Sequence, residues 1–123
     1  MPISTGGGNE GGVTIRYATR SEEIRSQFHN AFQKSTEEPN TTYGAMMRAS
    51  AIHSILQEIK RRVVDGDLDD LNLSKDDKER IQEIIDKGIK TTGSLILENN
   101  GKTFKNLRRE FNCAIEIIDE NKN

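Results

Sequence analysis

Apolar residues recur along most of this chain at spacings of three and four, and they alternate with polar residues in only one short stretch. In that stretch Val13, Ile15 and Tyr17 fall on one face, and Thr14 and Arg16 fall on the other. The alternation predicts a β-strand over residues 12–18. A lone strand leaves its backbone groups unpaired, and no second strand of similar quality follows. We therefore expect this strand to pair antiparallel with the same strand of a second copy.

The three-and-four spacing after the strand predicts two helices. Thr19 with Glu22 three residues later is the pattern of a capping box, and the apolar face that follows ends near Ser35. Pro39 interrupts the pattern, so the second helix is expected over about 42–65, capped by Thr41 or Thr42. Its paired methionines at 46 and 47 are interpreted as core filling.

Two further helices are expected in the second half of the chain. Residues 67–73 form an acidic connector, and Ser74 caps a third helix whose apolar side continues toward residue 96. The Asn-Asn-Gly sequence at 99–101 is a strong stop, and a last helix over about 102–120 follows it. These two helices are interpreted as an antiparallel hairpin.

Composition points to a small core and an uneven charge. The chain has 123 residues, of which 33% are hydrophobic and 31% charged, and such thin cores are often completed by oligomerisation. The net charge is −2, but residues 1–66 carry eight basic against seven acidic side chains, whereas residues 67–123 carry ten against thirteen. Any contact with DNA is therefore expected from the first half.

The sequence offers little for catalysis or metal binding. Cys113 is the single cysteine, and His29 and His53 lie far apart on predicted helices with no metal-ligand spacing around them. No apolar run approaches the length of a secretion signal or a membrane span. We expect a soluble cytoplasmic protein that is not an enzyme, needs no cofactor and contacts no membrane.

The order of strand, helix, short turn and helix resembles the ribbon-helix-helix DNA-binding proteins over residues 12–58. The resemblance rests on the strand residues 13–17, the amphipathic segment 22–34 and the segment 41–49. It implies an intertwined dimer whose paired strands enter the major groove of double-stranded DNA.

The resemblance also implies roles for particular residues. Thr14 and Arg16 would read base edges, and Thr41 and Thr42, at the start of the second helix, would grip a phosphate. Arg can donate two hydrogen bonds to guanine, and a helix N-terminus presents free N–H groups to an anion. Arg20, at the start of the first helix, is counted as a further DNA contact.

The helical extension resembles a subgroup of that family, the accessory proteins of plasmid relaxosomes. This resemblance implies binding to an origin of transfer and recruitment of a relaxase through residues 74–123. The expected fold is mostly α, with a ribbon-helix-helix domain followed by a C-terminal helical hairpin or stalk. Its divisions are a flexible arm (1–11), a DNA-binding and dimerisation domain (12–66), the connector (67–73) and a C-terminal helical domain (74–123).

Other interpretations stay open. The strand can be the edge of an ordinary α+β domain in which Arg16 is a solvated charge. Within DNA binding, the alternative is a repressor or partition protein of a plasmid or phage. From a different class, a helical adaptor or inhibitor would bind a protein and never contact nucleic acid. The dimer can also assemble further.

Overall fold

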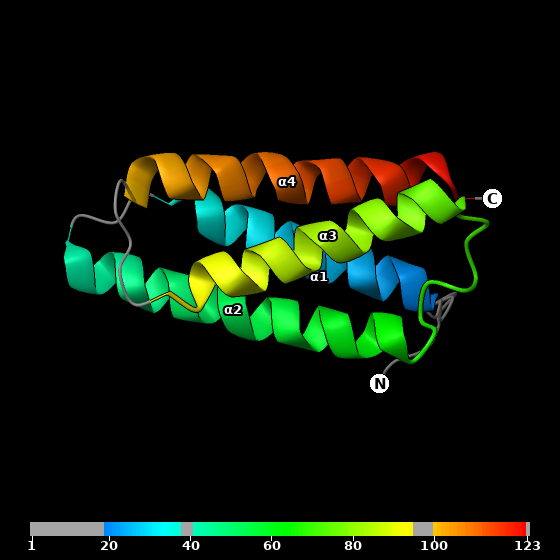
Figure 1. Ribbon diagram of the computed structural model, residues 1–123, viewed down its shortest axis with the longest axis horizontal. Helices are drawn as coiled ribbons and strands as arrows, with labels where there is room; N and C mark the ends of the chain where they lie inside the picture. Colours follow the sequence, from blue (N-terminus) through cyan, green and yellow to red (C-terminus); the bar gives the residue numbers. More distant parts are fainter. Residues whose placement is uncertain (1–18, 38–40, 95–99, 123) are drawn as a thin grey trace, which may run out of the picture.

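The chain forms a bundle of four antiparallel helices (Figure 1). The computed structural model describes residues 19–37, 41–94 and 100–122. Each helix runs opposite to the one before it, in an up-down-up-down order. The helices are α1 (Arg20–Thr36), α2 (Thr42–Val64), α3 (Lys75–Thr92) and α4 (Asn100–Glu120).

Three of the helices begin at the caps that the sequence predicts. The hydroxyl of Thr19 accepts a hydrogen bond from the backbone N–H of Glu22 at 3.2 Å, and α1 follows. Thr41 caps α2 and Ser74 caps α3 through equivalent bonds of 2.9 and 3.1 Å. Each hydroxyl satisfies one backbone donor that has no partner inside its helix.

Helix α2 ends at Val64, and the backbone turns out of the helix at Gly66. Gly66 has a φ of 91°, in the left-handed region that favours glycine. Its N–H bonds the carbonyl of Val63 at 3.1 Å, and the N–H of Asp67 bonds that of Arg62 at 3.0 Å. This pair of bonds is a Schellman motif, which directs the chain toward α3.

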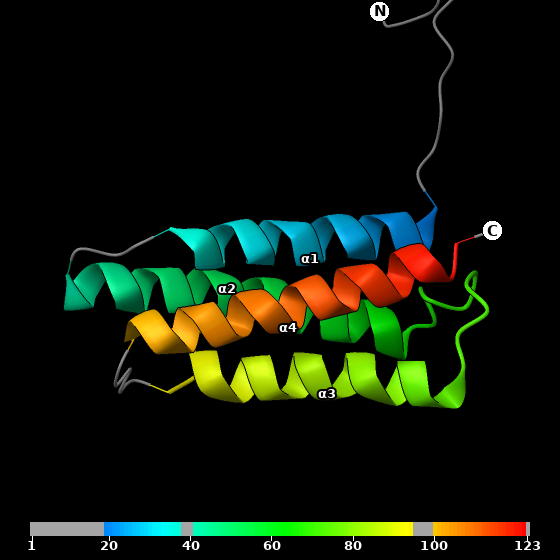
Figure 2. The same cartoon turned by 90° about the horizontal axis from the view of Figure 1, so that it is seen from above.

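The four helices enclose one continuous core. Each helix packs on two neighbours, in the cyclic order α1, α2, α3, α4, and the pairing of α1 with α4 is the most extensive. Figure 2 shows α1 and α4 side by side. The completely buried large side chains come from all four helices: Ile24, Phe28, Ile52, Leu56, Ile59, Ile81, Phe111 and Ile118.

The predicted ribbon-helix-helix fold, with a separate C-terminal hairpin or stalk, is wrong. The residues described, 19–37, 41–94 and 100–122, contain four helices and no strand. Phe28, on the apolar face of α1, is completely buried in the core that the four helices share. The predicted strand at residues 12–18 lies outside the described residues.

The connector between α2 and α3 is acidic, as its sequence indicates, but it is also part of the core. Leu68, Leu71 and Leu73 are buried and close this end of the bundle. Asp70 accepts a hydrogen bond from the hydroxyl of Ser21 at 2.9 Å, which ties the connector to the start of α1.

Gly88 of α3 lies close against the side chain of Leu56 of α2. A Cβ at Gly88 would lie 2.6 Å from Cδ1 of Leu56, which is completely buried. Gly88→Ala should therefore lower the free energy of unfolding by about 1–2 kcal/mol, since overpacking outweighs the gain in helix propensity. Gly101→Ala is the matched control because nothing lies within 4 Å of its Cβ position. It should leave stability unchanged or raise it, and urea denaturation of both variants tests the contrast.

Arg25 on α1 and Asp119 on α4 form a two-point ion pair. Nε and Nη2 of Arg25 donate to the two carboxylate oxygens of Asp119 at 2.7 and 3.0 Å. These bonds, assisted by Lys122, hold the pKa of Asp119 below its ordinary value. The side chains are 35% and 39% exposed, so solvent screens the attraction.

Asp119→Asn should lower the free energy of unfolding by less than about 1 kcal/mol at neutral pH. The carboxyl pKa is depressed in the folded state, so the pair contributes fully above the ordinary aspartate pKa of about 3.9. That contribution is lost as the pH falls through the lower pKa of the folded protein. Urea denaturation of parent and variant at neutral and strongly acidic pH should show the difference shrinking toward zero in acid. A difference that does not change with pH would contradict this account.

Candidate protein-interaction groove

Helix α2 projects beyond its two neighbours at the end of the bundle where it begins (Figures 1 and 2). It has 23 residues, whereas α1 has 17 and α3 has 18. Glu37, directly after α1, forms an ion pair with Arg48, and Thr92, the last residue of α3, contacts His53. The first turns of α2 therefore extend past the ends of both α1 and α3.

This projecting part of α2 exposes large apolar side chains. Tyr43, Met46 and Met47 are 72%, 40% and 55% exposed. Within the described part of the chain, the only other exposed large hydrophobic residue is Val64, at the opposite end of the same helix. The interpretation of the methionine pair as core filling is therefore wrong.

A groove lies between the start of α2 and the end of α3, with a volume of about 400 Å³. Tyr43, Met46 and Met47 form its apolar rim, and most of its exposed lining is apolar. The rest of the wall consists of Ala49, Ser50, His53, Thr92, Gly93 and Ser94.

Internal hydrogen bonds hold the groove floor in place. The hydroxyl of Thr92 donates to the carbonyl of Gly88 at 2.8 Å, so its lone pairs are left to accept. Nδ1 of His53 lies 3.1 Å from that hydroxyl and 3.2 Å from the carbonyl of Ile89. Because both neighbours are acceptors, the geometry places a hydrogen on Nδ1, which donates to them.

The groove lies in the basic half of the bundle. We define the basic half as residues 29–37, 41–53, 84–94 and 100–111, which carry eight Lys or Arg against three Asp or Glu. The other described residues carry nine against fourteen. The net charges of the two halves, +5 and −5, have opposite signs, so the near-neutral total hides a strong separation along the bundle axis.

The structure does not bring the sequence-predicted DNA contacts together. At the start of α1, outside the basic half, Nη1 of Arg20 lies 3.7 Å from Oδ1 of Asp67. Thr41 caps α2 and Thr42 is its exposed first residue, at the basic end. The two places are separated by the length of α1, about 25 Å. The predicted base-reading residues Thr14 and Arg16 lie outside the described residues.

Other kinds of site find little support in the described part of the chain. It contains no group of three His, Cys, Asp or Glu side chains placed to hold a metal ion. Cys113 is a half-buried free thiol. No helix among residues 19–37, 41–94 and 100–122 combines the length and the apolar character needed to cross a bilayer.

Comparisons of the chain with protein-family models, curated proteins and solved structures find no match. The support for a function of the groove therefore comes from its geometry alone. The sequence signal of the groove is a group of three large apolar residues, Tyr43, Met46 and Met47, at the start of the longest helix. Tyr43 and Met47 lie on the side of α2 opposite to the buried Ala45 and Ala49. The sequence does not show that these residues are exposed, because their exposure depends on the relative lengths and offsets of the four helices.

Met47→Gln should change the free energy of unfolding by no more than about 0.5 kcal/mol, because the side chain is already largely in water. Ile52→Ala, five residues further on and completely buried, should cost about 2–5 kcal/mol. Urea denaturation measures both variants. A loss above 1 kcal/mol for Met47→Gln would mean that Met47 is covered in the free protein and that the groove is closed.

Proposed function

We propose that this protein is a non-enzymatic helical adaptor that binds an amphipathic helix of a partner protein in the groove between α2 and α3. The observation that carries the proposal is the exposure of Tyr43, Met46 and Met47 at the start of α2, beyond the end of α3. Aromatic residues and methionine are enriched at protein interfaces, and flexible methionines adapt to an incoming apolar face.

A helix fits the groove because the next part of α2 already packs against another helix on the same side. Further along, α2 packs between α1 and α3. Its projecting start lacks the second of these neighbours, and a helix placed beyond the end of α3 completes the packing. Ala49, Ser50 and Gly93 in the groove wall are small, which permits the close approach of an incoming helix.

Charge selects among such helices. The surrounding half of the bundle is strongly basic, and its Glu37 is already paired with Arg48. An acidic flank on the partner helix is attracted to this half, whereas a basic flank is repelled. The occupant is therefore a helix with one apolar face and acidic flanks.

The prediction that the protein binds an origin of transfer and recruits a relaxase stays a prediction. Its base-reading residues Thr14 and Arg16 lie outside the described residues, and the adaptor proposal does not depend on them. The predicted homodimer likewise stays a prediction.

The adaptor proposal is tested with two synthetic amphipathic helices of about 18 residues that share a leucine face. One carries glutamates on its flanks and the other carries lysines at the same positions. In an NMR titration of the full chain, the acidic peptide should shift signals of residues 43–53 and 92–94, and the basic peptide should bind at least tenfold more weakly.

Met47→Glu should abolish binding of the acidic peptide, because it places a carboxylate on the apolar rim. Val64→Glu is the matched control, since it makes the same change at an exposed apolar residue at the opposite end of α2. Equal losses in the two variants would contradict the proposal, as would the absence of binding by either peptide. Dimerisation that Met47→Glu abolishes, seen by sedimentation, would assign the groove to a second copy instead.

A further inference from the structure

The second part of α1 and the first part of α4 lack acidic side chains. Neither residues 24–36 nor residues 100–109 contain an Asp or Glu, in a chain that has 20 of them. The two helices make the most extensive pairing in the bundle. The surface that α1 and α4 share is therefore free of carboxylates in its basic half, and its first exposed carboxylates on this side of α4 are Glu116 and Asp119, toward the end of the helix.

The ion pair between Arg25 and Asp119 shows which sides of the two helices meet. His29 and Gln33 lie one and two turns after Arg25, on the same side of α1. Asn112 and Lys105 precede Asp119 by seven and fourteen residues, on the same side of α4. These four side chains are exposed, as is that of Arg109. We call His29, Gln33, Lys105, Arg109 and Asn112 the α1–α4 face.

The cations of this face are not neutralised by the described protein. Lys105 and Arg109 make no ion pair within residues 19–37, 41–94 and 100–122. The nearby Glu110 turns toward α3, where it pairs with Arg80 at 2.8 Å and Lys87 at 3.5 Å. The face therefore keeps its positive charge available to a ligand.

Arg108 adds a third cation at the junction of the two helices. Its Nη2 donates to the carbonyl of Ser35 at 3.1 Å, in the last turn of α1, where the helix dipole favours a positive charge. The guanidinium is half-buried, and no described carboxylate pairs with it. It is thus held in a fixed position beside Lys105 and Arg109.

The α1–α4 face lacks the apolar groups that a protein or lipid partner requires. All exposed large hydrophobic residues of the described chain lie on α2, and none lies on α1 or α4. Protein interfaces bury aromatic and apolar anchors, and interfacial membrane binding inserts apolar side chains. Lysine, arginine and amide side chains are the groups that contact phosphate oxygens in nucleic-acid complexes.

We propose that the α1–α4 face binds the phosphate backbone of a nucleic acid. The acidic half of the bundle does not prevent this, because α4 is about 30 Å long and charges in water are screened within about 8 Å. The contacts come from side chains on helix flanks, so binding is independent of base sequence and strongly dependent on salt. The site is separate from the groove, which lies on the opposite side of the bundle between α2 and α3.

The test uses the full chain and fluorescence anisotropy with two labelled probes, a 24-base-pair DNA duplex of arbitrary sequence and a single-stranded RNA of 24 nucleotides. Binding to either probe at low salt should weaken at least tenfold in the double variant Lys105→Glu/Arg109→Glu. The neutral double variant Lys105→Gln/Arg109→Gln should reduce the slope of log affinity against log salt by about 2, since each lost phosphate contact removes about 0.9.

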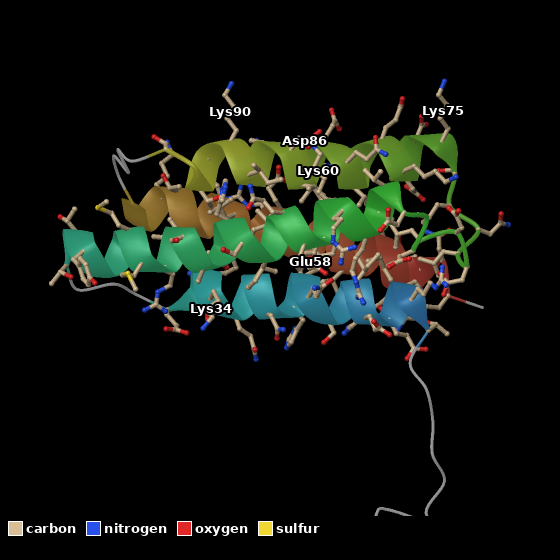
Figure 3. All side chains as sticks on the ribbon, turned by 90° about the horizontal axis from the view of Figure 1, so that it is seen from below. Lys34, Glu58, Lys60, Lys75, Asp86 and Lys90 are labelled. Atoms are coloured by element: carbon tan, nitrogen blue, oxygen red, sulfur yellow. The ribbon has the colours of Figure 1, made fainter. Side chains whose placement is uncertain are left out.

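Lys75→Glu/Lys78→Glu is the matched control. It makes the same change in net charge, at two exposed lysines of α3 that have no ion-pair partner among the described residues. Figure 3 shows Lys75 pointing away from the bundle. This variant should bind within twofold of the parent. Thermal melts of both double variants confirm that each is folded.

Three results would overturn the proposal. The first is no binding of either probe at low salt, and the second is an equal loss in the α3 control, which reduces the effect to net charge. The third is tighter binding, dependent on Lys105 and Arg109, to polyglutamate or to phosphatidylserine vesicles than to both nucleic acids. Polyglutamate would indicate an acidic protein as ligand, and the vesicles would indicate a membrane surface. The Met47→Glu variant should bind nucleic acid like the parent.

Discussion

The packing of α1 against α4 is the constraint on which the rest of the structure depends. It joins the first and last described helices, and it closes four successive helices into a ring around one core. Without it, α1 and α4 would each leave an apolar face in water, and packing of that face supplies most of the stability of a helix in a protein. Phe28 and Phe111 are completely buried as a result. The Arg25–Asp119 ion pair joins the start of α1 to the end of α4 in this arrangement.

Because the four helices form a closed ring, the part of α2 that is longer than its neighbours is left uncovered at one end of the bundle. The Gly88–Leu56 contact and the Lys60–Asp86 ion pair at 2.8 Å set the position of α3 along α2 (Figure 3). The extra length of α2 then has to emerge at one end, where α3 no longer covers the side of α2 that carries Met46. Ala45 and Ala49 continue the buried stripe there, whereas Tyr43 and Met47 lie on the opposite side of the helix, outside the amphipathic pattern that builds the core.

The two proposed surfaces share the basic half but lie on opposite sides of it. One is apolar and lies between α2 and α3, and the other is polar and cationic and lies between α1 and α4. This division follows from the cyclic order of the helices, which separates these two pairs. The two proposed ligands, a partner helix and a nucleic acid, would therefore occupy separate surfaces.

The sequence by itself determined the local structure of the described chain. Hydroxyl residues at 19, 41 and 74 and the glycine at 66 mark helix ends because each acts on backbone groups within a few residues. The spacing of apolar positions gave the helices and their buried faces for the same local reason. Tertiary structure alone decided which faces meet. An apolar stripe such as Ile24–Phe28–Ala31 is satisfied equally by a strand pair or by another helix, so it supported the wrong fold. The exposed groove rim and the charge of the α1–α4 face likewise arise only when helix offsets and neighbours are known, because both depend on residues far apart in the chain.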